Sequence, residues 1–242
     1  FNDGPTMKII NCMFVSNVGG AVHFKDQHER AKFLVLLHCV MANNSATRGG
    51  AVTLTITSHC RVYIILSVFE HNMFKNYLPK HIINTESFSK GTKGGAFYAD
   101  GTIMLLILYK NYFLWNAAGK GAAVHALRTE YFIIMHTIFR ENRALLEGTL
   151  YVEPIRIYLM NSSFVLNAAQ KEGGAVAVRP VYRRTSMIIV YACLFSNNTS
   201  VSGGAIHIVA FKEVCIQSTV FQYNKVSAFG GALHYSSTSR VS

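Results

Sequence analysis

The chain has 242 residues, of which half are apolar and 14% are charged, and its formal net charge is +11 at pH 7. It is too apolar to be disordered, and no apolar run approaches the roughly 18 residues of a transmembrane helix. The longest apolar runs, 31–42 and 103–109, therefore predict core strands. The positive charge favours an anionic partner, such as an acidic glycan, a phospholipid surface or nucleic acid.

One sequence motif recurs eight times along the chain: an aromatic or apolar residue, two residues of any type and an asparagine. Its first position is occupied by Phe14, Met41, Phe69, Phe113, Phe139, Phe164, Phe195 and Phe221. The asparagines are Asn17, Asn44, Asn72, Asn116, Asn142, Asn167, Asn198 and Asn224. Gly-Gly-Ala and an apolar residue follow in six copies, and two copies are degraded to Gly121-Ala122-Ala123 and Glu147-Gly148-Thr149. Such a repeat predicts a solenoid.

The spacing of the copies suits short strands. Most copies lie 25 to 28 residues apart, which fits three short strands and three turns per coil. The positions five and seven residues before each phenylalanine position are all apolar, the pattern of a strand with one face inward. A second strand is predicted to begin after each glycine pair. The sequence therefore predicts an all-β chain, a parallel β-helix of about eight coils of 25–30 residues.

The repeat fills nearly all of residues 1–242, so we expect a single elongated domain. Solenoids need atypical polar caps at their ends, and neither end of this sequence has one. We therefore expect the chain to be a segment of a longer array.

Each marker residue has an expected structural role. Asparagine tolerates the left-handed conformation, so the eight asparagines are expected at tight corners, with their amides stacked in a ladder. Glycine allows positive φ where the chain enters a strand, and the phenylalanines are expected to fill the interior. Two residues before each phenylalanine position is a small slot that includes Cys12, Cys39 and Cys193. A Cys12–Cys39 disulfide and small buried thiols both suit this column.

Phe-x-x-Asn combined with Gly-Gly-Ala and Ile, Leu or Val resembles the repeats of the chlamydial polymorphic outer-membrane proteins. The resemblance covers all eight copies and implies a right-handed parallel β-helix of the autotransporter-passenger type. Such passengers are adhesins displayed at the cell surface. The resemblance thus implies an extracellular or outer-membrane location and a role in adhesion or as a structural spacer. Such passengers carry no catalytic signature. From the sequence as a whole we expect no cofactor and no membrane insertion within this segment.

An outward row is predicted two residues after each repeat alanine, and it includes Tyr98, His125, Tyr151, His207 and His234. With strands about 4.8 Å apart, it would be an exposed file roughly 35 to 40 Å long. Its rings could stack on sugars or contact a protein of a host or neighbouring cell. The alternative is an ordinary solvated strand face. No acidic residue of this column joins His207 and His234, so no metal site is predicted.

Two insertions lengthen the regular coils, near residues 73–93 and 178–187. The first contains Lys75 and Lys80, and the second contains Arg179, Arg183 and Arg184. Insertions in a solenoid form loops that often bind partners. Loops also tolerate insertions that have no function, and this is an equal alternative. An acidic glycan would suit these charges, and no specific nucleic acid binding is predicted.

Enzymes built on β-helices, such as polysaccharide lyases and hydrolases, place several carboxylates on one face. The twelve acidic residues are scattered along this chain, and we expect none of them to form a column on adjacent coils. Glycoside hydrolysis needs two carboxyl groups about 5 to 10 Å apart, so no enzyme is predicted. The alternative is a carbohydrate-binding or carbohydrate-active β-helix that holds its ligand on the tyrosine and histidine row or the two basic loops.

Overall fold

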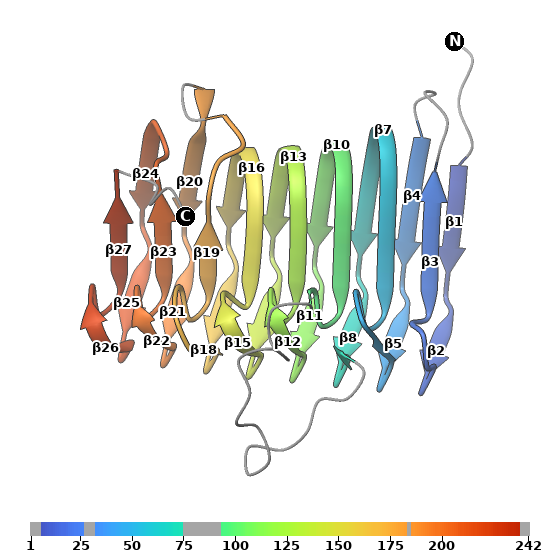
Figure 1. Ribbon diagram of the computed structural model, residues 1–242, viewed down its shortest axis with the longest axis horizontal. Helices are drawn as coiled ribbons and strands as arrows, with labels where there is room; N and C mark the ends of the chain where they lie inside the picture. The colour runs from blue at the N-terminus through green and yellow to red at the C-terminus, as the bar shows by residue number, and fades with distance from the viewer. Residues whose placement is uncertain (1–5, 27–31, 75–92, 183–184, 238–242) are drawn as a thin grey trace.

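The computed structural model describes residues 6–26, 32–74, 93–182 and 185–237. Figure 1 shows these residues as a stack of coils whose strands lie side by side along one long axis. Every strand pair in this part of the chain is parallel, and each strand pairs with its equivalent in the next coil. The predicted right-handed parallel β-helix is confirmed, with about seven turns.

Three sheets run along the stack. The first contains 12 strands, β1 (Thr6–Ile10), β3 (Val22–Asp26), β4 (Lys32–Leu37), β7 (Val52–Ile65), β10 (Phe97–Tyr109), β13 (Val124–Met135), β16 (Leu150–Met160), β19 (Val176–Val178), β20 (Met187–Tyr191), β23 (Ile206–Val209), β24 (Glu213–Gln217) and β27 (Leu233–Ser236). The second contains eight, β2 (Met13–Val15), β5 (Val40–Ala42), β8 (Val68–Glu70), β11 (Tyr112–Leu114), β14 (Ile138–Arg140), β17 (Ser163–Val165), β21 (Leu194–Ser196) and β25 (Val220–Gln222). The third contains seven, β6 (Ser45–Ala46), β9 (Met73–Phe74), β12 (Ala117–Lys120), β15 (Arg143–Glu147), β18 (Ala168–Ala169), β22 (Thr199–Ser202) and β26 (Lys225–Phe229).

In the middle coils, two strands that the sequence separates are one continuous strand. β7, β10, β13 and β16 have 14, 13, 12 and 11 residues and run from the glycine turn into the apolar ladder. The expectation of three short strands per coil is therefore wrong for these coils. The physical reason is that a register shift, near Gly101 in β10, bends the strand without ending it. In a later coil β19 and β20 stay separate, as predicted.

The interior consists of files of like side chains. The rings of Phe69, Phe113, Phe139, Phe164 and Phe195 are fully buried, and neighbouring rings lie parallel with centroids 4.7–4.9 Å apart. Phe221 continues the stack, 5.0 Å from Phe195. At the other end, Met41 pairs in register with both Phe14 and Phe69. The phenylalanines therefore form the continuous inner wall at the second sheet.

The eight asparagines form one hydrogen-bonded file beside the phenylalanine stack. From Asn44 to Asn224, each asparagine Oδ1 accepts two hydrogen bonds from the asparagine of the preceding coil, from its backbone N–H and from its Nδ2. Asn142, for example, accepts both bonds from Asn116 at 3.0 Å. Its own Nδ2 donates to the backbone carbonyl of Phe113 and to Oδ1 of Asn167. Each buried amide thus joins three consecutive coils.

The expected left-handed conformation lies one residue earlier than the sequence suggests. None of the eight file asparagines has a positive φ, whereas the residue before each of them does, for example His71 and Trp115, both at φ 51°. The reason is that the file asparagine points inward to bond with its neighbours. The preceding residue makes the corner and points outward. The expectation that the asparagines themselves adopt this conformation is wrong.

The small slot forms a second, shorter ladder. Ser67, Thr137 and Ser162 accept a hydrogen bond at their side-chain oxygens from the slot residue of the preceding coil. Cys12 and Cys39 stand in this column, and neither of them forms a disulfide. Of the two alternatives for Cys12 and Cys39, the structure has separate thiols rather than a disulfide.

The two glycines of each pair meet different constraints. The first is at positive φ, for example Gly173 at 59°. Gly174 has an ordinary φ, but an added Cβ would lie 2.3 Å from the carbonyl oxygen of Gly204 in the next coil. The backbones of successive coils therefore approach too closely here for a side chain. Ala122 occupies this second position in one degraded copy, and the next coil is one residue shorter there, since Gly148 is followed at once by Thr149, the equivalent of Ala123.

Candidate functional site

The predicted outward row of tyrosines and histidines does lie on the outer side of the first sheet, but it is covered. Tyr98 and His125 are 1% exposed, and Tyr151 and His207 are 5% and 6% exposed. The expectation of an exposed file is therefore wrong for these four residues. His234, in the last coil described, remains partly exposed.

The rings of this row stack on one another. The rings of Tyr98 and His125 have centroids 5.4 Å apart, and those of His125 and Tyr151 are 4.9 Å apart. His207 and His234 stack at 4.8 Å. Because these ring faces are taken up by neighbouring coils, they are closed to a sugar. The packing therefore leaves little ring surface of this row open to a sugar.

A column of charged residues covers the row, and sequence reasoning missed it. It consists of the residue that precedes each glycine turn, which is Arg48, Lys93, Lys120, Glu147 and Glu172 in successive coils. Neighbouring members pair as parallel bridges between coils. The guanidinium of Arg48 lies 5.6 Å from the Tyr98 ring centre, and Nζ of Lys120 lies 5.2 Å from that of Tyr151. Aligning the repeats at the position before glycine would have shown this column.

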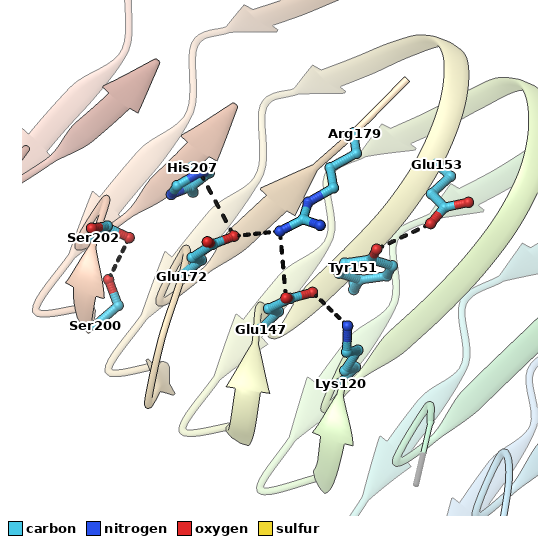
Figure 2. A network of polar contacts seen from close by, with 9 residues as sticks. All are labelled: Lys120, Glu147, Tyr151, Glu153, Glu172, Arg179, Ser200, Ser202 and His207. Carbon is cyan, nitrogen blue, oxygen red and sulfur yellow. Dashed lines mark hydrogen bonds and ion pairs between the residues drawn. The ribbon is translucent and has the colours of Figure 1, made fainter. Parts of the chain in front are cut away.

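The second half of the charged column is an internally neutralised network, shown in Figure 2. Glu147 contacts Lys120 Nζ at 3.0 Å and Nη2 of Arg179 at 3.4 Å. Nη2 of Arg179 also contacts Glu172 at 2.7 Å. His207 Nε2 lies 3.7 Å from Glu172. Two cations and two anions therefore balance.

Glu147 and Glu172 correct one expectation of the sequence. They stand on adjacent coils in one column, although no such carboxylate pair was expected. The carboxylate oxygens that contact Nη2 of Arg179 lie within about 6 Å of each other, near the separation used by glycosidases. A glycosidase acid must hold a proton near neutral pH. Burial opposes ionisation of Glu172, but His207 and Arg179 outweigh it and lower its pKa. The pair is therefore suited to ion pairing rather than to acid catalysis.

Tyrosines of the covered row are held in their protonated form. Burial, aided by the charge of Asp100, raises the pKa of Tyr98 to about 12, and its hydroxyl lies 3.1 Å from Asp100. Burial likewise raises the pKa of Tyr151, whose hydroxyl lies 3.0 Å from Glu153. Both hydroxyls therefore donate a hydrogen bond to a carboxylate on their own strand.

His125 is neutral in the folded chain. Burial, with smaller contributions from Lys93 and Lys120, lowers its pKa to about 3. The backbone of Lys120 approaches the ring and partly offsets this shift. Neither ring nitrogen makes a hydrogen bond of good geometry, however. The ring therefore behaves as an aromatic spacer between Tyr98 and Tyr151.

We expect acid to destabilise the fold through His125. Below pH 6.5 the unfolded chain takes up a proton at this residue that the folded chain cannot accept. The free energy of unfolding should therefore fall by about 2 kcal/mol between pH 6.5 and pH 5. Phenylalanine at this position should remove that part of the pH dependence. Urea unfolding of the wild type and His125→Phe at both pH values measures the difference.

The exposed His136 provides a matched control, since His136→Phe replaces a histidine on the surface of the fold. This variant should retain the acid loss of the wild type. Equal pH dependence of the wild type and His125→Phe would show that a proton reaches His125 in the folded chain.

Only part of the two basic insertions lies within the described residues. Lys75, Lys80, Arg183 and Arg184 lie outside the described residues. Arg179 is described, and it is bound to Glu147 and Glu172 rather than free for a partner. Within the described ranges no group of three or more histidine, cysteine or acidic residues could hold a metal ion.

The three parallel sheets and the internal ladders define a β-helix repeat protein. The model of the Chlamydia polymorphic membrane protein repeat matches residues 192–209, which contain Phe195, Asn198 and Gly203–Ile206. No curated protein and no solved structure matches the chain. The match covers one coil, and together with the fold it fits a polymorphic-membrane-protein-like β-helix repeat protein. A search of the described part of the chain finds no helix of the length and apolarity needed to cross a membrane.

Proposed function

We propose that the chain is a surface-displayed β-helix that acts in adhesion or as a structural spacer and carries out no catalysis. The match to a Chlamydia membrane-protein repeat supports a location at the cell surface. The observation that carries the proposal is that polar side chains bind one another and so hold the coils together. The eight asparagines bond to each other across the coils, and Lys120 and Arg179 neutralise Glu147 and Glu172.

The shape supports the same role. Eight stacked strands about 4.8 Å apart give a rod of roughly 35 Å with parallel flat sides. Continuous ladders join each coil to the next, so the rod resists bending at any one coil. A rod of this kind holds a contact surface at a fixed distance from its anchor.

Adhesion is tested with beads that carry the purified chain and are allowed to settle on cultured epithelial cells. We expect bead retention that saturates and that soluble chain competes away. Beads coated with an unrelated β-helix of similar size are the control. Retention equal to this control would favour the spacer role over adhesion.

Catalysis is tested separately with acidic and neutral polysaccharides as substrates. We expect no release of reducing ends or unsaturated sugars. Turnover that is lost in Glu147→Gln, while the thermal unfolding midpoint is unchanged, would overturn the non-catalytic proposal.

A second candidate function is binding of an acidic glycan, and the first half of the charged column favours it. Arg48, Lys93 and Lys120 stand on three successive coils. Among the described residues no carboxylate pairs with Arg48 or Lys93, whereas Lys120 is paired with Glu147. Cations spaced at the coil repeat, about 4.8 Å apart, suit a polyanion that runs along the stack.

Heparin and a neutral glucan, each immobilised, test this candidate at low and physiological salt. We expect heparin alone to bind, with salt-sensitive affinity. Arg48→Gln combined with Lys93→Gln should weaken binding about tenfold. Arg140→Gln combined with Arg143→Gln, which changes two exposed cations of other strands, is the matched control. Equal loss in both double variants would show that net charge alone attracts the glycan.

A further inference from the structure

The first sheet has a second outer surface, below the covered row, that is almost entirely apolar. It lies on six strands, β4, β7, β10, β13, β16 and β20, where the inward residues form the core. The outward residues between them are also apolar. The central outward row reads Val35, Tyr63, Ile107, Ile133, Tyr158 and Ile189. We call this row, with the outward positions two residues before and two residues after each member, the apolar face.

This face is open to solvent rather than part of the core. Phe132 and Ile134 of β13 are fully buried, whereas Tyr131, Ile133 and Met135 between and beside them are partly exposed. At the edge of the face Tyr191 is 46% exposed. Strands with one solvated face usually alternate apolar and polar residues. Here 16 of the 18 outward positions are apolar or aromatic, and the other two are Arg61 and Arg156.

The face is large and flat. Six parallel strands about 4.8 Å apart and five residues of about 3.3 Å each cover roughly 30 Å by 17 Å, or about 500 Å². Single exposed apolar residues are normal, but a contiguous area of this size on a soluble surface marks a contact site. The outward side chains do not support the core, so their apolar character is explained by what lies against them.

The charges on the face are positive, and the strands beside it carry Lys8 at one edge and Glu213 at the other. The guanidinium of Arg61 lies 5.5 Å from the Phe33 ring centre, and that of Arg156 lies 5.2 Å from the Tyr131 ring centre. Arg156 also donates a hydrogen bond to the hydroxyl of Tyr131 at 2.6 Å. Lys110 follows the face at the corner of β10, with its Nζ 5.2 Å from the Tyr109 ring centre. No described carboxylate forms an ion pair with these three cations.

We propose that the apolar face docks on a lipid surface that carries anionic headgroups. Such a surface is flat, takes up aliphatic and tyrosine side chains at its boundary and attracts arginine and lysine. The cations at the edge of the face complement it, and the net charge of +11 acts in the same direction. A second copy of the chain would cover the same area, but it would bring together two surfaces that are both positive. Docking is peripheral, and it does not depend on the proposed adhesive role.

Co-sedimentation of the purified chain with vesicles tests the proposal. We expect binding to vesicles of phosphatidylcholine with phosphatidylserine at least about tenfold stronger than to phosphatidylcholine alone, since each basic residue near the surface contributes about fivefold. The double variant Arg61→Gln with Arg156→Gln should therefore reduce the preference for phosphatidylserine-containing vesicles by at most about 25-fold.

Substitutions in the centre of the face separate docking from general charge. Ile133→Asp should reduce vesicle binding about tenfold or more, and Ile133→Lys should reduce it less, because both remove apolar area but lysine keeps the attraction. Leu166→Asp is the control, since Leu166 is 45% exposed and lies outside the face. Circular dichroism and the unfolding midpoint check that each variant folds.

Three results would each overturn the proposal. The first is vesicle binding that Leu166→Asp weakens as much as Ile133→Asp, and the second is vesicle binding with no preference for anionic lipid. The third is a concentration-dependent dimer in analytical ultracentrifugation that Ile133→Asp abolishes, which would identify a second copy of the chain as the occupant.

Discussion

Replacing Asn142 by alanine is expected to lower the free energy of unfolding by about 4 kcal/mol. The side chain is fully buried and makes four hydrogen bonds, two as acceptor from Asn116 and two as donor, to Phe113 and Asn167. Alanine leaves the backbone N–H of Asn116 without its acceptor in the dry interior and removes one hydrogen bond from the carbonyl of Phe113. Each buried orphaned group costs about 1–3 kcal/mol. Urea unfolding followed by circular dichroism measures the loss.

Asn17→Ala is the matched control for this effect. Asn17 occupies the same file but is only partly buried, and its side chain donates a single hydrogen bond, to Oδ1 of Asn44. Its loss should cost about 1 kcal/mol. A loss at Asn142 no greater than that at Asn17 would mean that water or a neighbouring side chain replaces the missing amide.

The asparagine file shows how far a repeat pattern can predict structure. Residues that recur at one position in every coil must stack, so the files at Asn142 and Phe139 followed from the sequence. The backbone conformation at the corner, however, could not be predicted from the repeat. The left-handed corner falls on the residue before each asparagine, and that position holds residues as different as His71, Trp115 and Leu166. Such a variable column carries no compositional signal, because the backbone pairing of the coils dictates the conformation there.

The candidate site was harder to predict for a different reason. Alternation places Tyr98 and His125 on the outer side of their strands, and this is where they lie. Burial depends on what crosses over that side, however, and the residues that do so come from the end of the third sheet, such as Lys120 of β12. The cross-section of a coil is not encoded in the period of the repeat. The outward direction of these side chains was therefore predictable from the sequence, whereas their exposure to solvent was not.

The apolar face illustrates a limit of alternation itself. Every member of the inward columns is apolar, which identifies them in the sequence, and alternation then predicts that the residues between them form the solvated side of a half-buried strand. Ile107 and Ile133 are as apolar as their inward neighbours. A run that is apolar on both sides predicts a strand covered on both sides. Within the described chain only the inner side is covered, which is the physical basis of the lipid-docking proposal.

Phe139→Ala is expected to destabilise the fold by about 4 kcal/mol, close to the effect at Asn142. The ring is fully buried between Phe113 and Phe164, at centroid distances of 4.9 and 4.7 Å. Alanine removes this area and leaves a cavity that the coils above and below cannot close, because their spacing is fixed by backbone pairing. Chemical denaturation of the purified variant measures the loss.

Phe139→Leu separates the stabilisation that comes from filling the space from the stabilisation that comes from ring stacking. Leucine fills much of the same space, and the chain itself carries the aliphatic Met41 in this file, so the loss should be about 1.5 kcal/mol. Tyr112→Ala is the control on the neighbouring strand residue, since Tyr112 is 46% exposed, and it should cost less than about 1 kcal/mol. A double-mutant cycle of Phe139 and Phe164 should give a coupling energy of about 1 kcal/mol. If the two losses simply add, the rings fill volume independently, and the file is a packed column without specific ring–ring attraction.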